Sequence, residues 1–443
     1  METPIYDFLQ KYAAADILRA HMPGHKGKTC VHGLEELFKL DITEIKGADS
    51  LFEADGIIAR SERNASELYG SVGTVFSAGG STLCIQAMLA LMKQEGRRVI
   101  AVRNVHRAFL NAAALLGLDV QWIMPTYKGG ILSGELKLPD VEAALAASTT
   151  PACLYVTSPD YTGRLADTAA LAALCHRYGA RLLVDNAHGA HLAFFEENLH
   201  PIALGADLCC DSAHKMLPAL TGAAYLHTSC KEYVPMLKQA MSFFGSTSPS
   251  YLIMASLDLC NRYISEHIRH DIKAALPRIA ELRSAFADRL VFSEGDPFHI
   301  TIKADESGLD GAELAELLRV NGVECEYADS ELVVLLMSPF SDTGDYYRLR
   351  AALESAVSGA SRVKKSGISV KPKLPKMAYA IREAAFAPSV EIPVEKAEGR
   401  ICASVKVPCP PAVPIAVSGE VIDSDCIEIF KAYGIKTVLV VEN

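Results

Sequence analysis

Lys215 is the first candidate for chemistry, because it follows Ser212, Ala213 and His214 between two apolar segments in "CCDSAHKMLPALTGAAYLH". Lysine is rarely buried unless something pairs with it, so this residue is either a solvated loop charge or a reactive amine. A desolvated lysine has a lowered pKa and can act as a nucleophile toward a carbonyl group. Ser212 and His214 add hydrogen-bond donors suited to a phosphate.

A carboxylate stands thirty positions earlier, where Asp185 closes an apolar run and opens "VDNAHGAH". A half-buried carboxylate needs a cationic partner or several hydrogen bonds, although an aspartate in this place can also be a helix N-cap. The spacing to Lys215 is enough for one crossover helix and one strand. The two side chains could therefore stand on neighbouring strand ends and face one cleft.

A third segment, "SAGGSTLCIQAMLALMK" at 77–93, opens a helical pattern with Gly80, Ser81 and Thr82. Backbone N–H groups at a helix N-terminus, together with two hydroxyls, would bind a phosphate without a metal. The segment lacks the lysine of a P-loop. The alternative is a plain turn followed by a helix cap.

A phosphate site, an acid and a reactive amine are together what pyridoxal 5′-phosphate (PLP) requires. The acid would keep the pyridine nitrogen protonated, and Lys215 would hold the cofactor through its amine. His106 in "RNVHRAF" is placed to stack on the ring, or is a surface or helix-capping histidine. We expect no metal site, because the twelve cysteines are scattered without a CxxC pair.

Short apolar runs that alternate with helical patterns must position these residues. The predicted strands are 99–103, 120–124, 152–158, 181–185, 206–212 and 223–227. Strands that are apolar nearly throughout, separated by amphipathic helices, predict an α/β fold with a mainly parallel sheet covered on both faces. In such sheets ligands bind beyond the carboxyl ends of the strands, which is where the candidate residues fall.

The chain of 443 residues is too long for one ordinary core. We predict long helices over 250–285, a smaller α+β unit after them and a linker at 358–376. The predicted domains are a segment contributing to an active-site wall (1–45), a PLP-binding large domain (46–285), a small α+β domain (286–360), and a linker with a C-terminal domain (361–443).

Charge and hydropathy narrow the class of partner. The net charge of −10 argues against a nucleic-acid or anionic-membrane surface. We see no signal peptide at the N-terminus, and no apolar run approaches the length of about 18 residues that a membrane helix needs. We therefore expect a cytoplasmic protein with a small-molecule substrate.

Six motifs in order give the sequence a specific resemblance. They are "HMPGHKG", "DITEIKGADSLFEADGIIARSE", "RNVHRAF", "VDNAHGAH", "DSAHKML" and "STSPSYLIMASLD". Together they closely resemble the ornithine/lysine/arginine decarboxylase family of fold-type-I PLP enzymes, in the shorter bacterial form without an N-terminal wing domain. The resemblance runs from about residue 5 to 270 and resumes at 399–422.

The resemblance implies a role for each matching residue. Lys215 carries the cofactor, Asp185 pairs with the pyridinium, His106 stacks on one ring face, Ala187 packs on the other, and His188 lies near the phenolic oxygen. The implied phosphate contacts are Gly80, Ser81, Thr82, Ser212 and His214, with Thr247 and Ser248 reaching the phosphate of a neighbouring subunit. "HMPGHKG" would form part of the wall or lid of this shared site, with structural roles for Pro23 and Gly24.

The implied activity is decarboxylation of a basic amino acid by a homodimer or larger homo-oligomer, giving a di- or polyamine. The chain departs from the family's usual pattern at Gly79 and Cys84–Ile85 and in the tail at 409–414. Another PLP reaction, such as an aminotransferase or lyase, and a weakened regulatory relative are the alternatives. "DPFHITIK" offers no arginine of the kind with which aminotransferases clamp a carboxylate. Glu53 and Asp55 are either ligands of the distal amine or ordinary surface acids.

Overall fold

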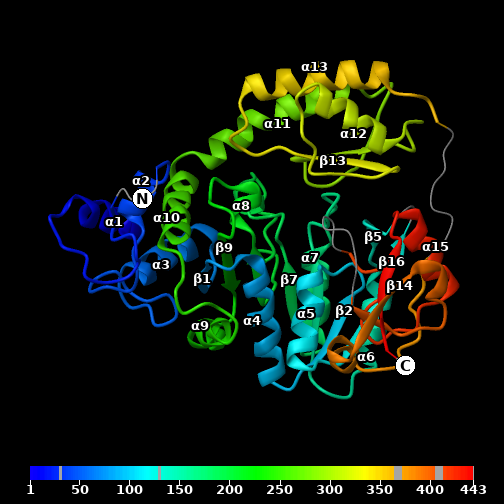
Figure 1. The fold of residues 1–443 in the computed structure, drawn as a ribbon, viewed down its shortest axis with the longest axis horizontal. Helices are drawn as coiled ribbons and strands as arrows, with labels where there is room; N and C mark the ends of the chain where they lie inside the picture. Colours follow the sequence, from blue (N-terminus) through cyan, green and yellow to red (C-terminus); the bar gives the residue numbers. More distant parts are fainter. Residues whose placement is uncertain (29–31, 128–130, 364–371, 405–412, 443) are drawn as a thin grey trace. The chain divides into compact units, whose positions relative to one another are not determined.

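The computed structural model describes residues 1–28, 32–127, 131–363, 372–404 and 413–442. The chain divides into two compact units, each built from two stretches, which can be located by the sequence colours of Figure 1. The first unit comprises Met1–Glu95 and Arg181–Asp271, and the second comprises Gly96–Ala180 and Ile272–Asn443. The domain boundaries expected from the sequence stay predictions.

The first unit contains four strands in the order β1-β9-β8-β7. They are β1 (Gly73–Ser77), β9 (Ala224–Thr228), β8 (Leu208–Asp211) and β7 (Arg181–Asp185). β7 and β8 are parallel, with Asp185 opposite Cys210, whereas β9 is antiparallel to both of its neighbours. The predicted strands 181–185, 206–212 and 223–227 are confirmed with small shifts of their ends.

Helices of the first unit pack on these strands and on one another. α4 (Gly80–Gln94) contacts β1, β8 and β9, and α1 (Pro4–Ala14) packs against α3 (Ile57–Tyr69) and α10 (Tyr251–Glu266). Asp258 of α10 accepts hydrogen bonds from the backbone N–H groups of Ile5 and Tyr6, at 2.9 and 3.0 Å, and so caps the first turn of α1. The remaining helical elements are α2 (Glu35–Leu40), η1 (Leu192–Phe194), α8 (Ala213–Met216), η2 (Lys231–Met236) and α9 (Leu237–Ser242).

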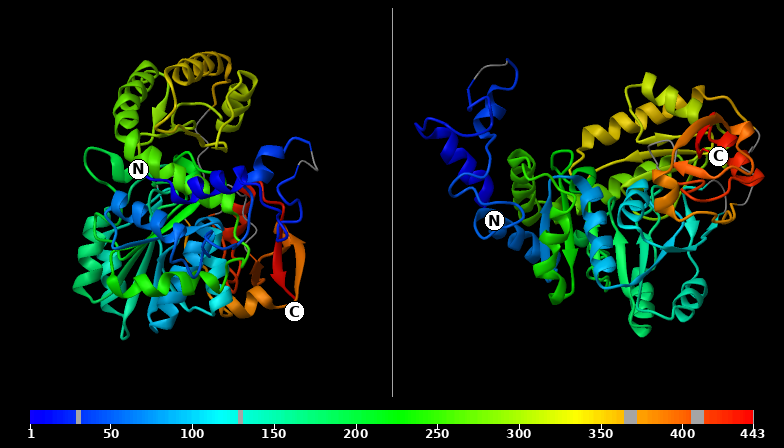
Figure 2. Two further views of the ribbon diagram at one scale, coloured as in Figure 1. Left: turned by 90° about the vertical axis from the view of Figure 1, so that its left-hand side faces the viewer. Right: turned by 60° about the horizontal axis from the view of Figure 1, so that its bottom comes forward.

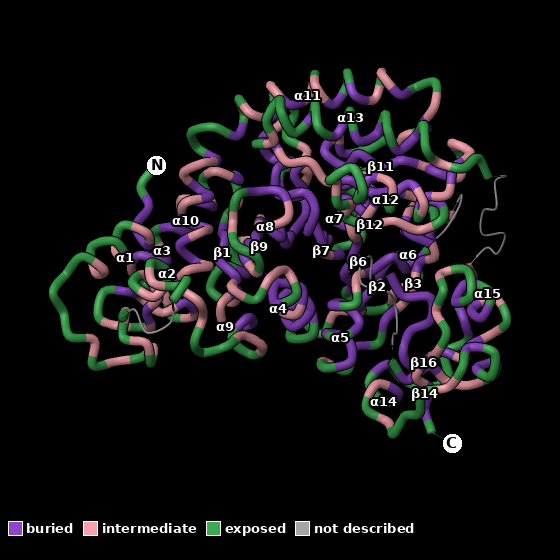
Figure 3. Tube along the Cα trace, turned by 45° about the horizontal axis from the view of Figure 1, so that its top comes forward, coloured by how far each residue is buried: buried purple, intermediate pink, exposed green. Residues whose placement is uncertain are grey.

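The second unit contains three parallel strands in the order β6-β2-β3. The strands and the elements beside them are β6 (Ala152–Thr157), β2 (Arg98–Val102), β3 (Val120–Ile123), the hairpin strands β4 (Thr126–Tyr127) and β5 (Gly134–Glu135), and helices α5 (Arg107–Leu116), α6 (Leu138–Ala146) and α7 (Thr168–Arg177). Figure 3 shows β2, β6 and β7 as buried along most of their length. This burial fits the nearly continuous apolar runs that predicted them.

A smaller antiparallel sheet follows in the same unit, with the order β10-β11-β13-β12. Three helices arch over one of its faces (Figure 2, left) and share an apolar core with its strands. The elements are α11 (Ile268–Ala285), β10 (Val291–Phe292), β11 (His299–Lys303), α12 (Gly311–Val320), β12 (Tyr327–Ala328), β13 (Leu332–Leu336) and α13 (Thr343–Gly359). The predicted α+β unit is confirmed.

The C-terminal part is built on a third sheet, of order β14-β16-β15. Its elements are α14 (Ile381–Phe386), β14 (Ser389–Pro393), η3 (Val394–Lys396), β15 (Cys402–Ser404), α15 (Ser424–Ala432) and β16 (Thr437–Val441). Ile131 and Leu132 from the β4–β5 connection join its apolar core. None of the helices in the described ranges has the length and apolar character needed to cross a bilayer.

Candidate active site

Lys215 is placed just beyond the carboxyl end of β8. The strand ends at Asp211, and the one-turn helix α8 then carries His214 and Lys215. The Nζ atom of Lys215 lies 2.9 Å from Nε2 of His188, a buried residue in the turn after β7. The structure therefore joins the candidate amine to a second candidate residue of the first unit.

Asp185 ends β7 and is 2 % exposed. Its Oδ1 accepts hydrogen bonds from the backbone N–H of Ala187, at 3.2 Å, and from the thiol of Cys210, at 3.6 Å. The residues that follow form turns, and the next helical element starts only at Leu192. The alternative of a helix N-cap is therefore wrong, and a buried carboxylate stands at a strand end as a pyridinium partner would require.

Ser81 and Ser212 come together from segments far apart in the sequence. Ser212 donates a hydrogen bond to Ser81 with an Oγ–Oγ distance of 2.8 Å, which leaves the Ser81 proton for another acceptor. Ser81 lies in the first turn of α4, whose first residue, Gly80, donates its backbone N–H to the carbonyl oxygen of Gly222 at 2.8 Å. Two hydroxyls at the N-terminus of a fifteen-residue helix fit a phosphate. Thr82 is exposed.

His214 has one fixed protonation site. Its Nδ1 lies 3.1 Å from the carbonyl oxygen of Ala223, which can only accept, so Nδ1 carries the proton. Burial, and secondarily the charge of Lys215, lowers the pKa of His214, against the raising effect of this hydrogen bond. The neutral ring is therefore favoured, with the lone pair on Nε2.

His106 lies in the second unit and is the N-cap of α5. Its Nδ1 accepts a hydrogen bond from the backbone N–H of Ala108 at 3.1 Å. The helix-capping alternative is confirmed. The stacking role stays a prediction.

Comparisons with known proteins decide the family. Residues 3–304 match the family model "Orn/Lys/Arg decarboxylase, major domain", and residues 368–434 match the model of its C-terminal domain. The chain belongs to the Orn/Lys/Arg decarboxylase family. The predicted family and fold class are confirmed, and the chain is accordingly a PLP-dependent amino-acid decarboxylase by family.

Relatives within the family align over nearly the whole chain. An arginine decarboxylase and an uncharacterized protein, both of Bacillus subtilis, are each 29 % identical and cover 97 % of this chain and 93 % of their own. The lysine decarboxylase structure from Francisella novicida gives a TM-score of 0.81 at 17 % identity, with 99 % of this chain and 81 % of that chain covered. A Sphingomonas wittichii serine palmitoyltransferase gives 0.55 at 14 % identity, covering 71 % and 81 %.

Four further candidate residues are exposed, namely Thr247 and Ser248, which are expected at the phosphate of a neighbouring subunit, and Glu53 and Asp55. Thr247 and Ser248 lie in the segment before α10, and neither is hydrogen-bonded to Lys215 or Ser81 in the described part of the chain. In the "HMPGHKG" segment with Pro23 and Gly24, His25 stacks on Phe38 with ring centroids 4.4 Å apart. The altered tail at Cys409–Ala412 lies outside the described residues.

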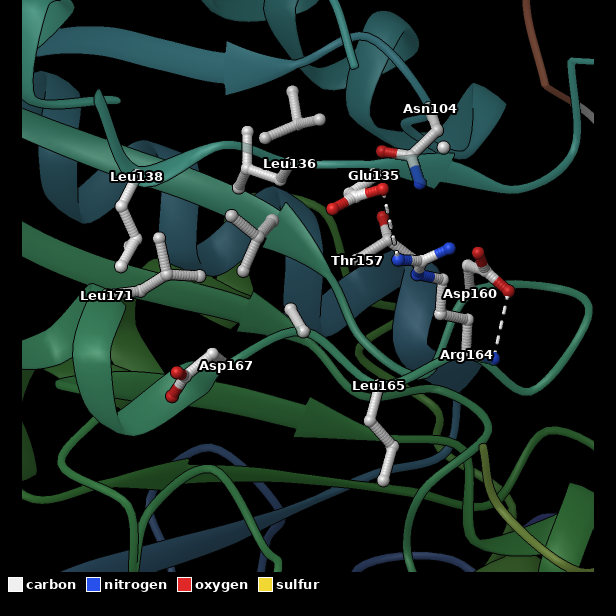
Figure 4. A pocket seen from close by; sticks show the side chains of 14 residues that line it. Asn104, Glu135, Leu136, Leu138, Thr157, Asp160, Arg164, Leu165, Asp167 and Leu171 are labelled. Carbon is white, nitrogen blue, oxygen red and sulfur yellow. Dashed lines mark hydrogen bonds and ion pairs between the residues drawn. The ribbon is translucent and has the colours of Figure 1, made fainter. Parts of the chain in front are cut away.

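The second unit of this decarboxylase-family chain contains a cavity of about 240 Å³ at the carboxyl ends of β2 and β6. Asn104, Glu135 and Arg164 line its polar end, and leucines of α6 and α7 line the other (Figure 4). Arg164 and Glu135 form a half-exposed ion pair at 3.9 Å. Because Asn104 stands two positions before His106, the wall of the cavity includes the segment leading to a predicted cofactor residue.

The sequence interpretation missed the residues that lie behind the cluster. Asn186, His200, Asp211 and His227 are buried and hydrogen-bonded together. The available signal was a charged residue at the end of the apolar run "ADLCCDS". Only the fold reveals its partners, because they come from separate segments.

Proposed function

We propose that the protein decarboxylates arginine with PLP bound at the cluster around Lys215 and Asp185. The observation that carries the proposal is the buried Asp185 together with the Lys215–His188 contact, which lie at and just beyond the carboxyl ends of two neighbouring parallel strands, and the paired hydroxyls of Ser81 and Ser212. Arginine is the first basic amino acid to test, because relatives named arginine decarboxylase align over more than nine tenths of the chain.

Several residues of the first unit would each bind a different part of the cofactor. Lys215 would hold it through Nζ, Asp185 would face the ring nitrogen, and Ser81, Ser212 and the α4 N-terminus would bind the phosphate. When bound, PLP supplies a sink for the electrons left behind as CO₂ departs. A carboxylate already fixed beside the ring nitrogen stabilises that charge without reorganisation.

Proton transfer falls to Lys215 and His188. Loss of CO₂ leaves Cα one substituent short, and a proton must replace it. Nζ and Nε2 are within hydrogen-bond distance, so a proton can pass from the histidine to the lysine and on to Cα. His188 is buried, which shields this transfer from bulk water.

The expected homodimer is part of the proposal. Leu18, Met22 and Phe243 of the first unit are large apolar side chains that are 84, 64 and 60 % exposed. A second copy would cover them and could bring its Thr247 and Ser248 to the phosphate. Mixed dimers of K215A with a T247A/S248A double variant then recover activity that neither parent has, and lack of any recovery would contradict the shared site.

An amine-release assay tests the activity. Purified protein with added PLP is incubated with arginine, lysine or ornithine, and CO₂ and the amine are measured. We expect release from arginine, with absorption at about 420 nm that is lost in Lys215→Ala and kept in the exposed-lysine control Lys231→Ala. Formation of a 2-oxo acid without CO₂ would indicate an aminotransferase reaction in place of decarboxylation.

A further inference from the structure

Asp211, the last residue of β8, is a fully buried carboxylate with four hydrogen-bond donors around it. Its Oδ1 accepts from Asn186 Nδ2 at 2.7 Å and from the thiol of Cys209 at 3.5 Å. Its Oδ2 lies 3.0 Å from Nε2 of His200 and 3.3 Å from Nε2 of His227. Burial would raise the pKa of Asp211, but the attraction of the two histidines outweighs it and holds the pKa far below its usual range.

The position of the proton on the His200 ring indicates that this cluster is a hydrogen-bond network and not a metal site. Nδ1 of His200 accepts a bond from the backbone N–H of Ile202 at 3.3 Å, so the neutral ring carries its proton on Nε2, facing Asp211. Ligand atoms of His200, Cys209 and Asp211 lie close enough together for a metal ion. A metal ion would bind the lone pair of Nε2, so the proton of the neutral ring would have to move to Nδ1. There it would point at the backbone N–H of Ile202, and two donors would face each other.

Asn186 connects this network to the candidate active site. It directly follows Asp185, its backbone N–H donates to Cys210 O at 3.0 Å, and its carbonyl accepts from Gly189 N at 2.8 Å. A Cβ on Gly189 would lie only 1.9 Å from Asn186 Oδ1, so the amide occupies the space that a larger residue at position 189 would fill. The Asn186–Asp211 bond thus fixes the turn 186–189 against the end of β8.

We propose that Asp211 is a positioning residue. Its carboxylate, held by His200 and His227, fixes Asn186 and thereby the turn that presents Asp185, Ala187 and His188 to the cofactor. The inference rests on the proposed function, because it concerns the site at which PLP is proposed to bind. A rigid support of this kind keeps binding groups in place before a ligand arrives.

The test measures PLP affinity and the melting temperature of the cofactor-free protein in Asp211→Asn, Asn186→Ala and the double variant. A hydrogen bond to a buried charge is at stake, so we expect each single variant to bind PLP about tenfold to a hundredfold more weakly. Because Asp211 acts through Asn186, the double variant should lose no more than the singles. Gly189→Ala, which displaces the Asn186 amide, should reproduce the loss.

Asp296→Asn is the matched control, since Asp296 forms a fully buried pair with His299 at 2.7 Å in the second unit. We expect it to lower the melting temperature without changing PLP affinity. If Asp211→Asn does not fold, Asn186→Ala and Gly189→Ala carry the test.

Three results would overturn the inference: unchanged PLP affinity in the variants, fully additive losses in the double variant, or stoichiometric zinc that Asp211→Asn loses. Wild-type protein that binds no PLP would instead refute the proposed function. The two failures are therefore distinguishable.

Discussion

The Nζ atom of Lys215 lies 2.9 Å from Nε2 of His188, although the two residues are 27 positions apart. The contact exists because β7 and β8 are parallel neighbours, so the turns after their carboxyl ends meet. Each residue is thereby placed by a different strand. A buried imidazole in contact with a lysine amine is an arrangement suited to proton transfer.

Replacement of His188 tests this contact. We expect His188→Ala to lower kcat about a hundredfold or more at saturating PLP, because the proton-transfer partner of Lys215 is lost. Absorption at about 420 nm should remain, since Lys215 is intact. His188→Gln, which keeps a hydrogen-bonding group without a titrating ring, should be as slow as the alanine variant. An unchanged kcat in either variant would exclude His188 from the reaction.

His214 should couple cofactor binding to proton uptake. Because Nδ1 donates to Ala223 O, Nε2 of the neutral ring can only accept, and a phosphate needs a donor there. The bound state would then hold one more proton than the free protein, so PLP affinity should rise as the pH falls from about 8 to about 6.

His214→Gln is the control, because an amide can donate without taking up a proton. The phosphate of PLP titrates near pH 6 in both proteins, so the difference between their affinity profiles is the quantity to measure. If the PLP affinity of the wild type and of His214→Gln changes with pH in the same way, the His214 ring does not contact the phosphate.

Glu62 should make the protein less stable as the pH rises. Burial raises the pKa of Glu62 to about 7, even though Lys238 lies 2.8 Å away and opposes the shift. The folded protein therefore keeps this proton between pH 4.5 and 7 after the unfolded chain has lost it, and stability falls across that window. We expect Glu62→Gln to remove about 3 kcal/mol of this decline, measured by urea unfolding at several pH values. Equal slopes in the two proteins would contradict the shift.

Glu420 and Arg103 form a buried ion pair at 2.6 Å in the second unit, with side chains 1 and 2 % exposed. Glu420 also accepts a bond from Val417 N at 2.8 Å. Glu420→Ala leaves the Arg103 charge buried without its partner, so we expect a loss of about 3–5 kcal/mol in the free energy of unfolding.

The exposed pair of Arg289 and Glu354, at 2.9 Å, is the matched control. Glu354→Ala should lower the free energy of unfolding far less than Glu420→Ala does, because solvent screens an exposed pair. Equal losses in the two variants would mean that burial of the Arg103–Glu420 pair has no energetic effect.

The sequence predicted the strand ends well because an apolar run indicates a buried strand, and the polar residue that follows it indicates where the strand ends. Asp185 and Lys215 were found in this way. The antiparallel direction of β9 could not be read, since an apolar strand has the same pattern in either direction. The link between Asn186 and Asp211 was missed because hydrogen bonds between separate segments leave no local pattern.

The bond from Ala108 N to His106 Nδ1 also affects how a flat ligand would be received. In the folded chain this hydrogen bond restrains rotation of the imidazole. Stacking then requires no further ordering of this side chain, so the full attraction between the two rings is available to binding. If His106 stacks on the ligand as predicted, the hydrogen bond that caps α5 also orients the stacking ring.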